Sequence, residues 1–247
     1  MLNISLNSDV RKQWHLYRLK TMAFVFVFLF LICKLSYVYA DSSLNGPTGL
    51  VNIPSAYVNG TKIGYHSIGK SGFYKLNTSF FNNAVEFGYI REKDQSVSSY
   101  NLKVPVLEED QYTPQIAVGA YNYKSSAVSQ TNYIVVSKYV DSFGVTAHIG
   151  YINSGGLKDA TKLINYRTIT DAVNDINSNN SKTFWGLEYS FFPMFSVMTE
   201  GQNGIMNGGV RFRPLPALTI DYDLLDLKNK NNLERKRIFN VNYNIGF

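Results

Sequence analysis

Short segments in which apolar and polar residues alternate follow one another through most of the chain after residue 60. The segment FGVTAHIGY, for example, has an apolar residue at every second position from Phe143 to Tyr151. A period of two is that of a β-strand whose two faces meet different surroundings. This criterion predicts an all-β fold with about twelve strands, over residues 61–67, 73–80, 84–91, 98–104, 115–122, 132–140, 143–152, 183–191, 194–200, 205–213, 217–225 and 237–247.

The connections between these segments indicate which face meets water. Four of the connections are short, FNN, DS, FP and PLP, and they alternate with mostly longer ones such as KSSAVSQT, DLKNKNNLER and residues 153–182, although PVLEEDQY is longer than its counterparts. Short turns at one end and long loops at the other are typical of bacterial outer-membrane barrels, which show apolar residues to lipid. We therefore predict an antiparallel up-and-down transmembrane β-barrel of roughly 10 to 12 strands over residues 60–247. The alternative is a soluble exported β-sandwich or barrel, which would bury the same apolar residues.

The last ten residues, IFNVNYNIGF, form a regular alternating strand that ends on an aromatic residue. In a membrane barrel the last strand has to pair with the first, because an unpaired backbone group in hydrocarbon costs several kcal/mol. A strand of this kind also resembles the C-terminal assembly signal that the outer-membrane insertion machinery reads. Its apolar positions are Phe239, Val241, Tyr243, Ile245 and Phe247.

The first 40 residues have the features of a secretory signal peptide. A basic stretch precedes the apolar run AFVFVFLFLI, and small residues end at Ala40, ahead of Asp41. The run is about half of the roughly 20 residues that a membrane-spanning helix needs, so we predict a signal peptide over residues 1–40 that is cleaved. Cys33 is the single cysteine. The processed chain would therefore contain no disulfide and no reactive thiol.

The positive charge of the chain belongs mostly to this leader. The formal net charge is +6, but five of the 24 Lys and Arg residues and one of the 18 acidic residues precede residue 41. The remainder has 19 basic and 17 acidic residues, a net charge of +2. Because no basic run with interleaved aromatic residues is left, nucleic acid is excluded as a partner.

The stretch NGPTGLVNIPSAYVNGTKIGY resembles the opening of the YjbH-like family of exopolysaccharide-associated outer-membrane proteins. The stretches QIAVGAYN, FWGLEYSF and MTEGQNGIMNGGVRFRP resemble the same family in the same order, and together they cover most of residues 44–247. The resemblance implies a β-barrel with a function in polysaccharide export or the biofilm matrix and without an assigned enzymatic activity. The opening motif consists of Gly46, Thr48, Gly49, Leu50, Pro54, Ser55 and Ala56.

Two interpretations are open for the segment 41–59 that contains this motif. Its glycines and prolines are typical of a turn-rich segment at the periplasmic rim of the barrel, which is the interpretation that we favour. The other interpretation is a plug or contact surface for the barrel. Farther along, residues 157–176 have near-helical apolar spacing interrupted by TIT. This stretch fits a short amphipathic helix and a polar loop equally.

Charged residues at polar-face positions of the predicted strands are candidates for a network inside the barrel. Two carboxylates could instead serve as the acid and base of a glycosidase, which needs them roughly 5 to 9.5 Å apart. Pairing of opposite charges in a narrow lumen is the simpler interpretation, so we predict no enzymatic activity. The candidate lumen residues are Glu86, Arg91, Lys138, Glu188, Glu200, Arg211, Arg213, Asp221 and Asp223.

No motif for a metal or cofactor accompanies these charges. His66 and His148 are isolated from each other and from carboxylates at ligand-like spacing. The glycine pair in NSGGL is not followed by the Gly-Lys-Ser/Thr of a phosphate-binding loop. We therefore expect neither a metal site nor a cofactor.

The sequence as a whole favours a non-enzymatic protein of the bacterial outer membrane, active in exopolysaccharide export or in organisation of the surface and biofilm matrix. The expected partners are membrane lipid, the barrel insertion machinery, and an exopolysaccharide with its export proteins. Side chains largely fill a barrel of this size, which favours an accessory or scaffold role over free passage of a thick polymer. The alternatives are a soluble exported carbohydrate-binding protein and a secreted hydrolase.

Overall fold

The computed structural model describes residues 17–18, 20–22, 41–68, 71–93, 98–124, 130–154, 182–202, 205–228 and 237–245. Residues 1–38 and 39–247 are two separate compact units. In the first, residues 17–18 and 20–22 are helical, and the rest of the predicted signal peptide lies outside the described residues. No helix in the described parts is both long and apolar enough to cross a membrane. Most of the 153–182 connection also lies outside them.

Two very short strands, β1 (Asp41–Ser42) and β2 (Thr48–Gly49), precede a series of longer ones. A short 3-10 turn, η2 (Asp141–Phe143), lies between two of the longer strands. The longer strands are β3 (Thr61–Ile68), β4 (Ser71–Phe80), β5 (Val85–Glu92), β6 (Ser98–Leu107), β7 (Gln115–Tyr123), β8 (Thr131–Val140), β9 (Val145–Ser154), β10 (Lys182–Phe192), β11 (Phe195–Gln202), β12 (Ile205–Leu215), β13 (Leu218–Leu224) and β14 (Arg237–Ile245).

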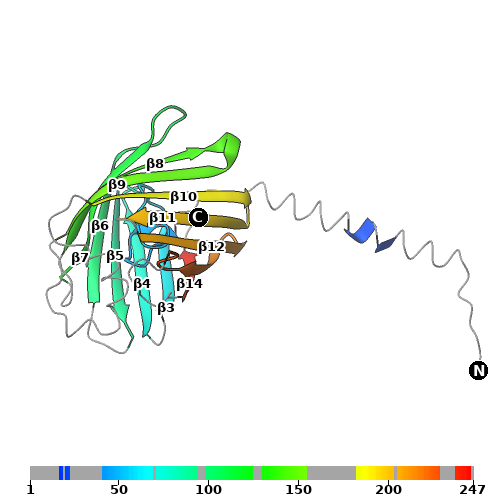
Figure 1. Ribbon diagram of the computed structural model, residues 1–247, viewed down its shortest axis with the longest axis horizontal. Coiled ribbons are helices and arrows are strands. Elements are labelled where there is room, and N and C mark those ends of the chain that lie inside the picture. The colour runs from blue at the N-terminus through cyan, green and yellow to red at the C-terminus, as the bar shows by residue number, and fades with distance from the viewer. Residues whose placement is uncertain are drawn as a thin grey trace, which may run out of the picture. The chain divides into compact units, whose positions relative to one another are not determined.

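The twelve longer strands form one closed barrel (Figure 1). Each strand from β3 to β13 pairs antiparallel with the next, and β14 pairs with β3, with Val241 opposite Tyr65. The predicted up-and-down antiparallel barrel is therefore confirmed. The terminal strand does close on the first strand of the barrel, as expected, although Phe247 lies outside the described residues.

Side chains alternate between a polar lumen and an apolar exterior. In β10, Trp185, Leu187 and Tyr189 point outward and are each more than 40% exposed, whereas Phe184, which precedes them, and Glu188, which lies between Leu187 and Tyr189, are buried. Strand β14 shows the same pattern, with Phe239, Tyr243 and Ile245 exposed and the asparagines between them buried. A soluble barrel or sandwich would bury the apolar set, so the soluble alternative is contradicted. The exterior is instead that of a barrel solvated by lipid.

The connections at one end of the barrel are short, as predicted. Residues 81–84, 141–144, 193–194 and 216–217 join β4 to β5, β8 to β9, β10 to β11 and β12 to β13. Residues 108–114, between β6 and β7, are the longer exception at this end. Short turns mark the periplasmic end of an outer-membrane barrel. We refer to this end as the short-turn end.

A charge on the exterior tests whether this surface lies in lipid. Leu187→Arg, near the middle of β10, is expected to reduce the free energy of unfolding by about 2 to 4 kcal/mol, the cost of Arg at the bilayer midplane. Denaturant titration in lipid vesicles measures the loss of unfolding free energy. A folded membrane barrel resists detergent until it is heated and then changes its gel mobility, and the temperature of this heat-dependent gel shift should fall in parallel. Phe81→Arg, on an exposed turn, is the control and should change little. Equal effects of the two substitutions would contradict a lipid-facing β10.

Candidate functional site in the barrel lumen

Residues 41–56 lie inside the barrel, and we call this segment the plug. Every residue in it is buried. Strand β1 pairs with β2, and Gly49 forms a further bridge with Pro54, so the plug is a compact folded segment. This differs from the favoured expectation of a segment at the periplasmic rim. Of the 41–59 segment, residues 57–59 alone are half-buried.

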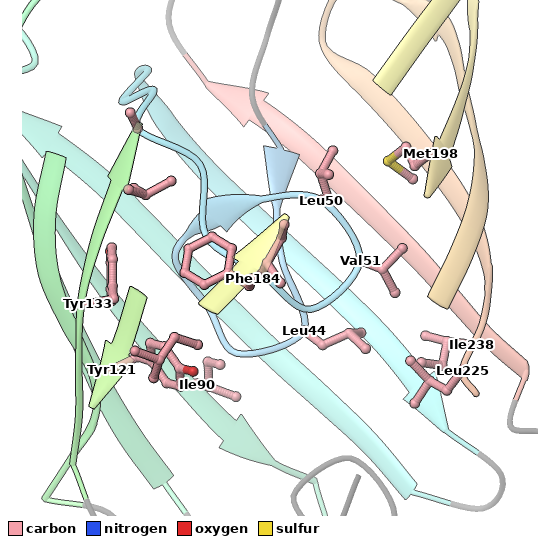
Figure 2. Close-up of a cluster of buried hydrophobic side chains, with 14 of the residues drawn as sticks. Leu44, Leu50, Val51, Ile90, Tyr121, Tyr133, Phe184, Met198, Leu225 and Ile238 are labelled. Atoms are coloured by element: carbon pink, nitrogen blue, oxygen red, sulfur yellow. The ribbon is translucent and has the colours of Figure 1, made fainter. Parts of the chain in front are cut away.

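The apolar residues of the plug pack against apolar residues of the barrel wall. Leu44, Leu50 and Val51 belong to one buried cluster with wall residues, as Figure 2 shows. A side chain at Gly186 of β10 would collide with Leu50 Cδ1, so this wall position has to be small. The wall residues drawn and labelled in Figure 2 are Ile90, Tyr121, Tyr133, Phe184, Met198, Leu225 and Ile238.

Glu200 of β11 binds the backbone of the plug. Its carboxylate accepts hydrogen bonds from the N–H of Asn52, at 2.9 and 3.0 Å, and from the N–H of Ile53, at 3.2 Å. Asn207 of β12 donates a further bond to Glu200 at 2.8 Å. Successive backbone N–H groups form an anion-binding concavity. The wall here supplies the anion and the plug supplies the concavity.

Glu86 of β5 and Lys103 of β6 form a second contact with the plug. The Glu86 carboxylate accepts bonds from the N–H of Thr48, at 2.9 Å, and from its hydroxyl, at 2.6 Å. Lys103 Nζ lies 3.6 Å from Glu86 Oε2 and donates to the carbonyls of Thr48, at 2.9 Å, and Tyr57, at 2.8 Å. This acid and base together satisfy both polar backbone groups of Thr48.

Lys75 and Asn77 of β4 hold the beginning of the plug. Lys75 Nζ donates to the carbonyls of Ser42, at 3.0 Å, and Ser43, at 3.3 Å. Asn77 donates to the Ser42 hydroxyl at 2.7 Å and to the Gly46 carbonyl. Gly46 has φ +105°, a conformation that favours glycine, and an added Cβ would lie 2.8 Å from Ile90 Cδ1. The first glycine of the family motif is thus required by the turn and by its closeness to the wall.

Arg211 of β12 is fully buried at the centre of an ionic network. Its guanidinium lies 2.8 Å from Asp221, 3.1 Å from Glu188 and 3.5 Å from Asp41 of the plug. Arg213 lies 3.1 Å from Glu188 and 3.5 Å from Asp41. Both arginines therefore link wall carboxylates to the first residue of the plug.

Most of the predicted lumen residues are brought together, but two lie elsewhere. Arg91 is exposed on the exterior, because β5 places residues 85, 87, 89 and 91 outward. Lys138 follows the outward set of β8 and lies at the rim, where its Nζ is 3.1 Å from Glu109. Near a strand end a long basic side chain can extend to the water interface, so polarity alone did not indicate the lumen. The residues that do face the lumen are Glu86, Glu188, Glu200, Arg211, Arg213, Asp221 and Asp223.

The sequence analysis missed several polar residues of the lumen. Apart from Asp41 of the plug, they occupy inward positions of predicted strands, so extending the alternation rule to Lys, Asn and Ser on every strand would have found most of them. One example is Ser137, which accepts the N–H of Ala56 at 2.8 Å and lies 2.7 Å from His148 Nδ1. The described residues contain no His, Cys, Asp and Glu group suited to a metal ion. The missed residues include Asp41, Lys62, Lys75, Asn77, Lys103, Ser137, His148 and Asn240.

The connection from the plug to β3 is attached to the long turn at the short-turn end. The Tyr57 hydroxyl donates to Glu109 at 2.6 Å, and Glu109 also accepts the N–H of Tyr139 at 2.8 Å. Burial, and then the hydrogen bond to Glu109, raise the pKa of Tyr57 well above its ordinary value. Tyr57 therefore stays neutral and able to donate at alkaline pH. In the same turn as Glu109, hydrogen bonds from the N–H groups of Thr113 and Tyr112 lower the pKa of Asp110.

The Tyr57 contact makes a prediction for alkaline pH. A raised pKa in the folded state means that the contribution of Tyr57 to stability is complete below its ordinary pKa of 10.0 and is lost as pH rises above it. Tyr57→Phe removes this titration, so its unfolding free energy should fall less steeply above about pH 10 than that of the unsubstituted protein. Denaturant titrations at pH 8 to 11, about 10 being the midpoint for a free tyrosine, measure the difference. Identical slopes would contradict the raised pKa of Tyr57 in the folded state.

A closed barrel with an apolar exterior and a polar lumen that holds residues 41–56 of the same chain defines a plugged outer-membrane β-barrel. The chain belongs to the YjbH family, described as exopolysaccharide biosynthesis protein YbjH, whose model matches residues 43–241. The resemblance noted from the sequence is thereby confirmed. The match includes most of the plug as well as the barrel strands from β3 into β14.

Three solved porins and outer-membrane proteins are similar in structure. The KdgM porin matches with a TM-score of 0.49 and 10% identity, over 75% of this chain and 99% of that chain. The NanC porin matches with a TM-score of 0.45 and 12% identity, over 76% and 98%. The outer membrane protein Omp33 of Acinetobacter baumannii matches with a TM-score of 0.40 and 10% identity, over 75% and 96%. No curated protein has a sequence that matches this chain.

Proposed function

We propose that the protein, after removal of residues 1–40, is a non-enzymatic outer-membrane barrel that acts in exopolysaccharide export or in organising the polymer at the cell surface. The observation that carries this proposal is the plug. Its backbone is bound by Glu86, Lys103 and Glu200, so the lumen is closed at rest by a segment of the same chain. Membership of an exopolysaccharide biosynthesis family supplies the polymer class.

The engagement of the lumen carboxylates supports the non-enzymatic part of the proposal. Glu86 and Glu200 accept backbone N–H groups of the plug, and Glu188 and Asp221 pair with Arg211. A general acid or base has to come within hydrogen-bond reach of a substrate proton. These four carboxylates instead face the plug and the arginine.

The exterior and the last strand support lipid and the insertion machinery as partners. The apolar residues of β14 that resemble an assembly signal, Phe239, Val241, Tyr243 and Ile245, alternate with the buried asparagines and point away from the lumen. Their side chains are therefore on the surface that meets lipid or another protein during insertion. The assembly role of these residues is part of the proposal.

Polymer export and polymer organisation at the surface make different demands on the plug. A polymer cannot share the lumen with residues 41–56, because plug and wall are in contact through both apolar and polar groups. Export through the barrel would therefore need the plug to leave its place. Organisation of the polymer at the surface would use the barrel with the plug in place.

Deletion of the gene and complementation tests the proposal. Loss of the protein should lower the amount of polymer that reaches the cell surface, and the wild-type chain should restore it. Polymer retained inside the cell would support export, whereas an unchanged total with more polymer shed into the medium would support surface organisation. Unchanged amount, retention and shedding together would contradict both roles.

A further inference from the structure

The charged side chains exposed on the barrel are divided between its two ends. At the short-turn end lie all the exposed acidic residues of the described chain, on the turns that join β6 to β7 and β8 to β9. At the opposite end, which we call the long-loop rim, the exposed charges of the described residues are all basic. The acidic residues are Glu108, Asp110 and Asp141, and the basic ones are Arg91, Lys93, Lys124, Lys228 and Arg237.

The five basic residues occupy one continuous part of the long-loop rim. Arg91 lies near the end of β5 and Lys93 follows that strand, whereas Lys124 follows β7. Lys228 follows β13, and Arg237 begins β14. In the barrel these strands belong to one run of neighbours, from β13 through β14, β3, β4, β5 and β6 to β7. In the parts of the chain that the structure describes, none of the five pairs with a carboxylate.

Two of these cations are on the lipid-facing exterior of the barrel and not above its lumen. Arg91 lies two positions after Tyr89 on the outward side of β5, and the residue between them is buried. Arg237 lies two positions before Phe239 on the outward side of β14, and again the residue between them is buried. Because both arginines are at strand ends, their long side chains can extend from the apolar surface to the headgroup region.

Tyrosines on neighbouring strands lie directly beside Arg91 on the exterior. Tyr65 of β3 is opposite Tyr74 of β4, with ring centroids 5.4 Å apart, and Tyr74 is in turn opposite Arg91. Tyr89 of β5 is opposite Tyr100 of β6, with ring centroids 5.2 Å apart. Tyrosine is enriched at membrane–water interfaces, where its ring lies at the level of the headgroups. This row therefore places Arg91 at the headgroup level.

The position and the charge of the long-loop rim together select an anionic lipid headgroup as its partner. Long loops of outer-membrane barrels are extracellular, so this rim meets the outer leaflet. Arginine can bind a phosphate through two parallel hydrogen bonds, and lysine binds it as a point charge. A soluble acidic polymer would approach from the water, whereas Arg91 and Arg237 are on the surface that faces lipid.

We propose that the long-loop rim binds the phosphate groups of lipid headgroups in the outer leaflet. Arg91 and Arg237 bind phosphate at the edge of the apolar surface, and the three lysines add positive charge around it. The inference rests on the outer-membrane location within the proposed function and not on the role in polymer handling. It adds a specific lipid contact on one part of the barrel circumference.

Titration of the purified full chain in detergent with fluorescently labelled lipopolysaccharide, a phosphorylated lipid, tests the inference. Binding should be saturable and should weaken as salt is raised, because the charges are at the surface. Dephosphorylated lipopolysaccharide should bind roughly tenfold or more weakly, and so should the phosphorylated lipid to the double variant Arg91→Gln and Arg237→Gln. Arg91→Lys with Arg237→Lys should retain binding. Lys138→Gln, at the short-turn end, should not alter it.

Other results would overturn the inference. Equal affinity for the dephosphorylated lipid would mean that the exterior binds acyl chains alone. An unchanged affinity in the double glutamine variant would place the phosphate elsewhere. Displacement of the lipid by inorganic phosphate, or by soluble polygalacturonate, at matched ionic strength would identify the rim as a site for free phosphate or for an acidic polymer.

Two features of the test keep its outcomes separate. Both arginines are exposed, so their substitution should leave the heat-dependent gel shift unaltered, which shows that the variants are folded. The titration contains no exopolysaccharide. Absence of lipid binding together with loss of polymer output on gene deletion would therefore leave the polymer role in place, and the reverse result would leave the lipid contact in place.

Discussion

Deleting residues 43–56 is expected to convert a closed barrel into a conducting one. The lumen wall carries charged and amide side chains that bind the plug backbone, so water and ions can solvate the wall once the plug is absent. Conductance in planar bilayers should rise by roughly tenfold or more, since side chains fill barrels of about 8 strands but leave a channel in those of 16 to 18. Single-channel recording of purified protein measures the change.

Two further samples make this experiment decisive. The full-length double variant Glu86→Gln and Glu200→Gln keeps the chain intact but weakens the charge-assisted bonds to Thr48 and Asn52, so it should open intermittently. A synthetic peptide of residues 41–59 should close the deleted barrel again. A heat-dependent gel shift establishes that each variant is folded. Folded variants that conduct no better than the wild type would show that the plug does not close a path.

Replacing Arg211 by alanine is expected to give the largest loss of stability of any single substitution considered. Arg211 is completely buried and pairs with Asp221, Glu188 and Asp41. Removing one partner of a buried ion pair costs about 3 to 5 kcal/mol, because the remaining charges stay buried without compensation. The measurement is denaturant unfolding in lipid or detergent, followed by the fluorescence of Trp185.

Lys138→Ala is the matched control for this prediction. Lys138 also pairs with a glutamate, Glu109 at 3.1 Å, but its side chain is partly exposed at the rim. Partly exposed pairs contribute about 0 to 1 kcal/mol, so little stability should be lost. If the two variants lost similar free energy, the ionic network around Arg211 would not be a main source of stability in the barrel.

Alternation along the chain predicted the strands because each one separates two different environments. The segment 143–152 corresponds to β9, which begins instead at Val145 because residues 141–143 form a 3-10 turn and Gly144 adopts φ +61°. The closing strand was predicted for the same reason, since lipid on one side and the lumen on the other impose a period of two. The alternation of apolar and polar residues was therefore sufficient to predict the strands, whose structure depends on local backbone geometry.

The position of the plug could not be predicted in this way. Residues 41–56 have no period of two, and their main contacts are with distant residues. Glu86 is 38 positions from Thr48, and Glu200 is 148 positions from Asn52. These contacts use backbone N–H groups, which every residue except proline has, so the plug sequence carries little sign of them. Gly46, Gly49 and Pro54 signalled turns correctly but did not indicate that the turns are enclosed.

The short link from the plug to β3 has a consequence for how the molecule is assembled. Strand β3 forms one side of the seam where the barrel closes, and its partner β14 is the last of the twelve barrel strands in chain order. The ring therefore stays open until β14 pairs with β3, whereas the plug precedes every strand of the ring in the chain. We expect the strands to wrap around the plug, which then acts as a template that aligns charges from opposite walls before the seam shuts. The segment that closes the lumen would thus also guide its construction.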